Sequence, residues 1–139
     1  MQIAQSDEQI THCFSVLSEL RPRLDRTSFI TTIRAMQEEG FVLVYLEHGG
    51  EVVSVAGYRI YLNLAMGGQT LYVYDLVTGE KHRSKGFGAQ LLADLESVAR
   101  AAQCKRVHLD SHMTRHRAHK FYLTHGFDIV AHHFVKGLE

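Results

Sequence analysis

The stretch Arg83-Ser84-Lys85-Gly86-Phe87-Gly88-Ala89 carries the fold prediction. It lies between an apolar, strand-like run over 70–77 and the start of a strongly amphipathic helix. Its two glycines lack the Cβ that would keep a ligand away from the backbone. Successive N–H groups in such a loop, together with those of the first helical turn, form a cradle for an anion. Because Arg83 and Lys85 add positive charge, this stretch predicts a pyrophosphate site.

Three phosphate-binding motifs resemble this loop in part. A Walker A loop needs four residues between its first glycine and its Gly-Lys-Ser/Thr end, and the interval from Gly79 to Gly86 does not fit. A dinucleotide fingerprint needs a further glycine where Leu91 stands, and it belongs on a parallel sheet. The third motif, Arg-x-x-Gly-x-Gly/Ala, matches at Arg83, Gly86 and Gly88. On these residues alone, a glycine-rich helix start without a ligand stays open as the alternative.

The pattern along the rest of the chain predicts a mixed α/β domain. Gly-containing turns join the three middle strands, which favours an antiparallel meander. Pro22 is the sole proline and no linker or repeat interrupts the sequence, so residues 1–139 are expected to form a single domain. The expected elements are a short strand at Ile3, helices from Ser6 to Leu20 and over 28–39, strands over 41–46, 52–64 and 70–77, a helix that follows Gly88, a strand over 106–109, a helix over 118–125, and a last strand or strand pair over 127–135.

Composition excludes several classes of protein. The 139 residues carry 15 Lys and Arg against 15 Asp and Glu, so the chain lacks the positive charge that binding to nucleic acid requires. No apolar run approaches the ~18–20 residues of a membrane span, and the polar first residues do not resemble a secretory signal. Cys13 and Cys104 are too few for a disulfide scaffold or a four-thiolate zinc site. A reducing, cytoplasmic setting is expected.

The combination of motifs resembles the GNAT N-acetyltransferases over nearly the whole chain. Asp75-Leu76-Val77-Thr78, shortly before the glycine-rich loop, is similar to the family's fourth strand as it enters its pyrophosphate loop. Ala118-His-Lys-Phe-Tyr122 followed by Gly126-Phe127 is similar to the family's Ala-x-x-Phe-Tyr…Gly-Phe segment. The run from Arg115 to Tyr122 is also similar, more weakly, to the branch that contains aminoalkylphosphonate N-acetyltransferases.

The resemblance implies a fold, a cosubstrate and a set of binding residues. The fold would be the acyl-CoA N-acyltransferase fold, with a mostly antiparallel central sheet splayed between strands four and five and flanked by four helices. Acetyl-CoA would be the cosubstrate, with no resident metal. Many family members carry an Asn that contacts pantetheine where this chain has Arg115, so this pantetheine contact is not assigned to Arg115. The implied acetyl-CoA-binding residues are Leu76, Val77 and Thr78 for the pantetheine arm, and Arg83, Ser84, Lys85, Gly86, Phe87, Gly88 and Ala89 for the pyrophosphate.

Two residues are candidates for proton transfer. A phenol has a pKa of about 10, close to that of a departing alkyl thiol, so Tyr122 is expected to protonate the thiolate. The alternative for Tyr122 is an aromatic core residue. Asp75 stands in an otherwise apolar strand, where an unpaired carboxylate would be costly to bury. Asp75 is expected to take the proton of the incoming ammonium, directly or through water; binding a cationic amine or facing solvent are its alternatives.

The predicted function is direct transfer of an acetyl group from acetyl-CoA to a primary amine of a small molecule, with aminoalkylphosphonates among the candidate acceptors. The alternatives are a non-catalytic acyl-CoA-binding regulatory module, an acetyltransferase for protein N-termini or lysines, and a His-rich metal-binding domain. His112 and His116 have a spacing that zinc ligands use, but no further ligand follows them, so solvated or stacking histidines are expected. The C-terminal strand leaves a homodimer open.

Overall fold

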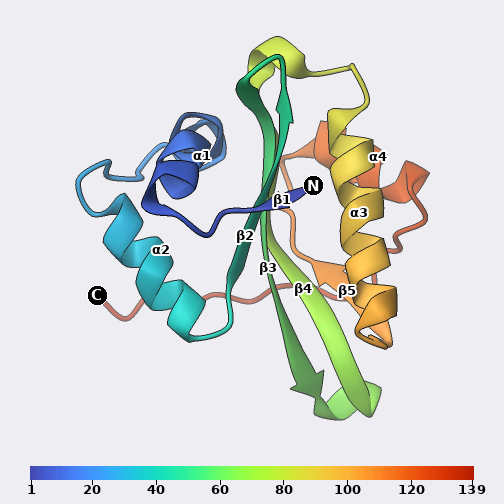
Figure 1. Ribbon diagram of the computed structural model, residues 1–139. Helices are drawn as coiled ribbons and strands as arrows, with labels where there is room; N and C mark the ends of the chain where they lie inside the picture. The colour runs from blue at the N-terminus through green and yellow to red at the C-terminus, as the bar shows by residue number, and fades with distance from the viewer. The chain divides into compact units, whose positions relative to one another are not determined.

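The computed structural model describes residues 1–139, and its central element is a five-stranded sheet (Figure 1). The strands lie side by side in the order β1-β2-β3-β4-β5. Consecutive strands from β1 to β4 pair antiparallel, and β5 runs parallel to β4. The predicted antiparallel meander and the mixed α/β class are therefore confirmed. The strands are β1 (Gln2–Ile3), β2 (Val42–His48), β3 (Glu51–Asn63), β4 (Gly68–Thr78) and β5 (Arg106–Leu109).

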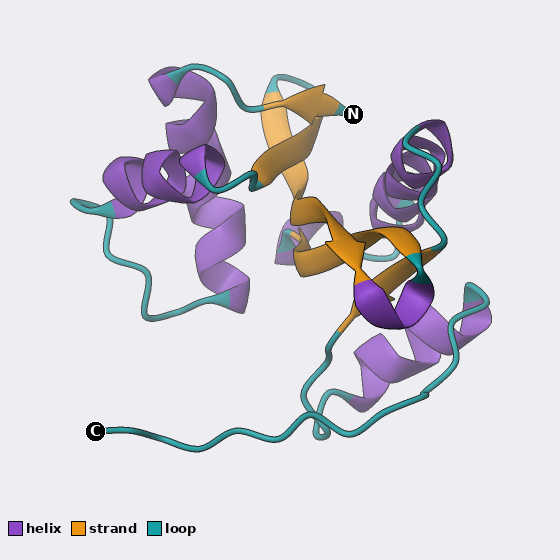
Figure 2. Cartoon of the chain, turned by 90° about the horizontal axis from the view of Figure 1, so that it is seen from below, coloured by secondary structure: helices purple, strands orange, loops and turns teal.

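Helices cover both faces of this sheet. Helices α1 (Asp7–Leu20) and α2 (Phe29–Glu38) lie on one face, and α3 (Phe87–Ala101) lies on the other (Figures 1 and 2). Ser6 caps α1 through a capping box: its hydroxyl accepts the N–H of Gln9, and the Gln9 side chain accepts the N–H of Ser6. Gly40, just beyond α2, has a left-handed φ of 89°, in agreement with the predicted stop.

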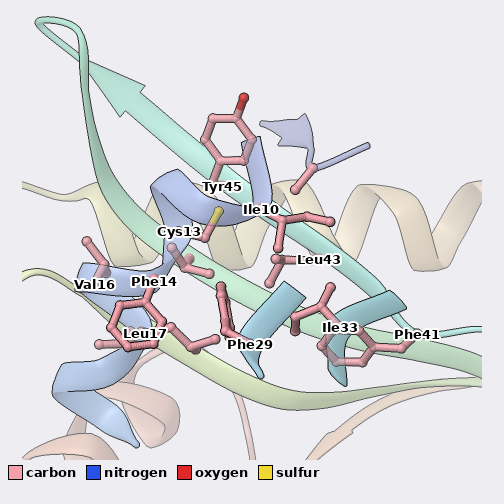
Figure 3. Close-up of a cluster of buried hydrophobic side chains, with 13 residues drawn as sticks. Ile10, Cys13, Phe14, Val16, Leu17, Phe29, Ile33, Phe41, Leu43 and Tyr45 are labelled. Atoms are coloured by element: carbon pink, nitrogen blue, oxygen red, sulfur yellow. The ribbon is translucent and has the colours of Figure 1, made fainter. Parts of the chain in front are cut away.

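The two sets of helices bury different side chains. Between α1, α2 and the sheet lies a cluster that includes Ile10, Phe14, Phe29 and Phe41 (Figure 3). The rings of Phe14 and Phe29 meet edge to face, with centroids 5.1 Å apart. On α3 the buried residues are Leu91, Leu92, Leu95 and Ala99, which recur at helical spacing. Side chains from α1 and α2 thus pack on one face of the sheet, and side chains from α3 pack on the other.

The chain divides into two compact units, Met1–His108 and Leu109–Glu139. The second unit contains α4 (His116–Thr124), which begins two residues before the predicted start, and a tail without regular structure. The predicted strand or strand pair over 127–135 is wrong, because no residue after Thr124 lies in a helix or a strand. The apolar residues of this segment suit a strand, but a strand also needs a neighbour to which its backbone can bond. Exposed apolar side chains of this tail include Ile129, Val130, Phe134, Val135 and Leu138.

Candidate active site

The glycine-rich loop connects the end of β4 to α3 through a short 3-10 helix, η2 (Glu80–His82). Gly86 is the N-cap of α3 with a left-handed φ of 87°, and no side chain caps this helix. The first backbone bond of α3 runs from the Gln90 N–H to the Gly86 carbonyl. The N–H groups of Phe87, Gly88 and Ala89 therefore have no acceptor within the helix. Ser84 also adopts a positive φ of 62°, so the loop turns sharply just before the helix.

Arg83 is held by two groups of the same unit. Its Nε donates to the Thr78 carbonyl at 3.2 Å, and its Nη2 lies 3.3 Å from a carboxylate oxygen of Glu19 on α1. The same Glu19 oxygen accepts the N–H of Glu80 at 2.9 Å. Glu19 thereby connects α1 to the loop. The sequence pattern did not predict this contact.

The last residues of β4 present backbone groups on the side away from β3. Val77 pairs with Val55, and the Gly79 N–H donates to the Val53 carbonyl at 2.9 Å. Because hydrogen-bonded and non-bonded pairs alternate along an antiparallel ladder, Val77 bonds toward β3, whereas Leu76 and Thr78 point to the opposite edge. There β5 begins beside Gln69, whose carbonyl accepts the Lys105 N–H. Since β5 has four residues, Leu76–Thr78 extend beyond its end.

A β-bulge in β4 places Asp75. The register between β3 and β4 pairs Tyr58 with Val73 and Gly57 with Asp75, so Tyr74 is the extra residue. Tyr74 and Asp75 consequently face the same side, which α1 covers. The Tyr74 carbonyl accepts a bond from Arg21 Nη2 at 3.1 Å, and Asp75 Oδ1 accepts one from Arg21 Nε at 2.7 Å. The Asp75 side chain is 13% exposed and that of Arg21, the C-cap of α1, is 54% exposed.

Aromatic rings and a second arginine surround this bulge. The rings of Tyr72 and Tyr74 meet edge to face at 4.6 Å, and the buried Phe41 ring lies 6.1 Å from Tyr74. Arg59, the β3 partner of Tyr72, has its guanidinium carbon 5.6 Å from the centroid of the Tyr74 ring. The sequence prediction included Asp75 but missed Arg21 and Arg59. The only signal for Arg21 was its place at the end of a helix, which does not indicate a partner.

Tyr122 lies in the middle of α4, in the second unit. Its ring contacts those of Phe121 and Phe127, with centroids 5.4 and 5.7 Å away. Burial raises the pKa of the Tyr122 phenol above its ordinary value, and the charge of Arg115 acts in the opposite direction with a smaller effect. At neutral pH the phenol therefore holds its proton, as a proton donor must.

The histidines around α4 form hydrogen bonds within their own segment. His119 Nε2 donates to the His112 carbonyl at 2.9 Å, and His125 Nδ1 donates to the Phe121 carbonyl at 2.7 Å. His112 Nδ1 lies 2.9 Å from the Thr114 hydroxyl. No group of three or more His, Cys, Asp or Glu side chains is arranged to hold a metal ion. No helix combines the length and apolar character that crossing a membrane would need.

Comparisons with known proteins agree on one family. The model of the acetyltransferase (GNAT) family matches residues 7–127. The "Uncharacterized N-acetyltransferase YhdJ" of Bacillus subtilis (strain 168) is 32% identical over 138 residues, which are 98% of this chain and 96% of the relative. The aminoalkylphosphonate N-acetyltransferase of Salmonella typhimurium is 32% identical over 89 residues, 64% of this chain and 58% of the relative.

A solved structure supports the fold. The crystal structure of an acetyltransferase from Trypanosoma brucei superposes with a TM-score of 0.80 at 24% sequence identity. The match covers 99% of this chain and 97% of that one. At this level of identity the likeness concerns the fold alone, and it agrees with the mixed sheet flanked by helices that was predicted.

Proposed function

This chain belongs to the acetyltransferase (GNAT) family and is an N-acetyltransferase, and we propose that it transfers the acetyl group of acetyl-CoA directly to the primary amine of a small molecule in a ternary complex. Acetyl transfer to an amine is the activity of the family; the acceptor class and the residue roles are our proposal. We propose further that both compact units belong to one domain, since the family match spans the boundary at His108. The free cysteines suit the cytoplasm as its location.

The observation that carries the proposal is the pairing of two features at the end of β4. The loop before α3 offers the N–H groups of Phe87, Gly88 and Ala89, which have no acceptor within the helix, and Arg83 precedes them in the same loop with its side chain on the Thr78 carbonyl and Glu19. A pyrophosphate fits such a cradle because its charge is met by N–H donors and by the positive end of the helix dipole. A few residues upstream, Leu76 directs its backbone groups and Thr78 its N–H to an edge that β5 does not reach, which suits the amides of a pantetheine arm, whereas the Thr78 carbonyl accepts from Arg83.

The chemistry needs two proton movements. When bound, acetyl-CoA supplies an acetyl group activated as a thioester. In the proposed mechanism Asp75 takes a proton from the incoming ammonium, directly or through water, so that the amine nitrogen can form the new amide bond as the carbon–sulfur bond breaks. Tyr122 then gives its phenolic proton to the departing sulfur. Asp75 is engaged by Arg21, so it is free to act as a base only when that arginine finds another partner.

The first experiment is a thermal shift of the untagged protein with acetyl-CoA and, as the matched control, with an acetyl-pantetheine thioester that lacks the pyrophosphate and the nucleotide. A ligand present at ~100 times its Kd stabilises the folded state by about 2.7 kcal/mol, which raises the Tm of a domain of this size by roughly five degrees or more. We expect this rise with acetyl-CoA and a much smaller one with the control. Equal shifts would contradict the loop assignment, and no shift at millimolar acetyl-CoA would refute the cosubstrate.

Transfer itself is measured by release of the CoA thiol across a panel of amines, with the acetylated amine identified by mass spectrometry. Small amines with different substituents, peptides with a free N-terminus and peptides with an internal lysine form the three arms. We expect turnover in the small-molecule arm, and aminoalkylphosphonates enter it because one relative bears that activity in its name. Turnover confined to the peptides would favour the protein-acetyltransferase alternative.

A further inference from the structure

We propose that Arg21 is a specificity-determining residue that binds an acid group of the acceptor, and that the acceptor is accordingly a short zwitterion with a primary amine and a carboxylate, phosphonate or phosphate. The inference rests on the proposed N-acetyltransferase function and names its substrate class. The carrying observation is the ion pair between Arg21 and Asp75 at the β4 bulge, both of which belong to the first compact unit.

The pair is unequal in its exposure. Asp75 is 13% exposed and lies on the sheet, whereas Arg21 is 54% exposed and belongs to the end of α1. Arg21 Nε contacts Asp75 Oδ1 at 2.7 Å, and Arg21 Nη2 contacts the Tyr74 carbonyl at 3.1 Å. A guanidinium has five N–H donors, and these two bonds use two of them. The remaining donors of this half-exposed side chain are available to an anion, which a guanidinium binds with two parallel bonds.

Charge balance then selects the acceptor. A simple alkylammonium that approaches Asp75 would place two cations beside one carboxylate, and it would leave Arg21 without its counter-ion. A zwitterion replaces both partners at once: its ammonium meets Asp75 and its acid group meets Arg21. The single Arg21–Asp75 ion pair is replaced by two, one at each protein charge, so neither protein charge is left uncompensated. The exchange also frees Asp75 from Arg21, which the proposed base role requires.

The surroundings restrict the length of the acceptor. The bond from Arg21 Nη2 to the Tyr74 carbonyl holds the guanidinium at the bulge, so it cannot follow an acid group that lies far from the amine. The edge-to-face rings of Tyr72 and Tyr74 stand at the bulge, and the guanidinium of Arg59, which is paired with Glu39 at 3.0 Å, lies over Tyr74. These features fit a small molecule whose two charged groups are separated by a short chain of one to a few carbon atoms.

The test compares acceptors that differ only in the acid group. The probes are β-alanine and β-alaninamide, with 2-aminoethylphosphonate and ethylamine as the second pair, assayed at equal concentrations of free amine. In the parent enzyme we expect kcat/KM to favour the acid over its neutral partner by about tenfold to a hundredfold, the range of a hydrogen-bonded charge pair. Arg21→Gln should reduce this ratio to near one, mostly through KM. Arg23→Gln, an exposed arginine two residues further on, is the matched control and should leave the ratio unchanged.

Binding gives a second readout that does not depend on turnover. Isothermal titration of the protein saturated with CoA, which cannot react, should show heat with the zwitterion and not with the neutral amine, and Arg21→Gln should abolish it. The two acid pairs distinguish a carboxylate from a phosphonate acceptor. Equal use of acids and neutral amines by the parent, or a ratio that Arg21→Gln does not change, would overturn the inference while the acetyltransferase function stands. Failure to bind acetyl-CoA in the thermal shift would instead refute the proposed function itself.

Discussion

Replacement of Gly57 by alanine tests how the sheet face beside Asp75 is built. Gly57 is the β3 partner of Asp75 at the bulge, and the ring of Phe41 lies against its backbone. A Cβ at this position would lie 2.2 Å from Phe41 Cζ and 2.6 Å from Cε2, separations that real Cβ atoms do not show. Phe41 is 3% exposed within the core cluster, so its ring has no free space into which to move.

The expected magnitude follows from this contact. Overpacking a core costs about 1–3 kcal/mol, and for a chain of this length each kcal/mol lowers Tm by roughly 3–5 °C. Gly57→Ala should therefore lower Tm by about 3–15 °C in a thermal unfolding experiment. Gly57 has no positive φ, so without the ring alanine would stabilise by ~0.4–1 kcal/mol through the unfolded chain. The sign of the effect thus depends on Phe41.

Two controls make the reasoning refutable. Gly137→Ala adds the same methyl group at a position with nothing within 4 Å, and it should leave Tm unchanged. In a Phe41→Leu background, where the ring is gone, Gly57→Ala should cost much less than in the parent. The same cost in both backgrounds, or no cost in the parent, would show that the close approach of ring and backbone does not constrain this face.

Three further outcomes are expected. Tyr122→Phe should lower kcat by about 10²–10⁴-fold with little change in the KM for acetyl-CoA, and equal kcat values in variant and parent would remove Tyr122 from the mechanism. Because burial raises the pKa of Tyr122, the parent enzyme should lose activity only at a pH above the ordinary tyrosine range. Arg83→Glu should weaken CoA binding, measured by calorimetry, by about tenfold or more. The control is Arg100→Glu, which makes the same charge change at the far end of α3. Equal CoA affinities for the two variants would contradict the pyrophosphate cradle. Burial raises the pKa of the Cys13 thiol from 9.0 to about 12, so the folded state keeps a proton that the unfolded chain loses, and the stability this provides is complete below pH 9 and declines as pH rises toward 12. Urea unfolding of Cys13→Ala should show a shallower alkaline decline than the parent, and parallel curves would refute this account.

Local features of the chain were the most predictable. The capping residue Ser6, the left-handed Gly40 and the glycine-rich loop before α3 depend on backbone dihedral preferences and nearby hydrogen bonds, which the sequence specifies directly. The three middle strands follow from their apolar residues and the turns between them. The tail over 127–135 is also rich in apolar residues but is not a strand, because pairing depends on a neighbouring edge that a pattern within one segment does not provide.

The sequence by itself determined the family, the order of the main elements and the position of the glycine-rich loop, because each depends on short-range spacing of residue types. The tertiary structure decided which charges meet. Arg21 and Asp75 are 54 residues apart, and Glu19 and Arg83 are 64 apart, yet each pair is in contact. These contacts depend on where α1 ends above the sheet and on the register of β4, in which Asp75 faces the same side as Val77, the side that α1 covers. A charge acts over a few ångströms, so its partner is set by the path of the folded chain and not by separation along the sequence.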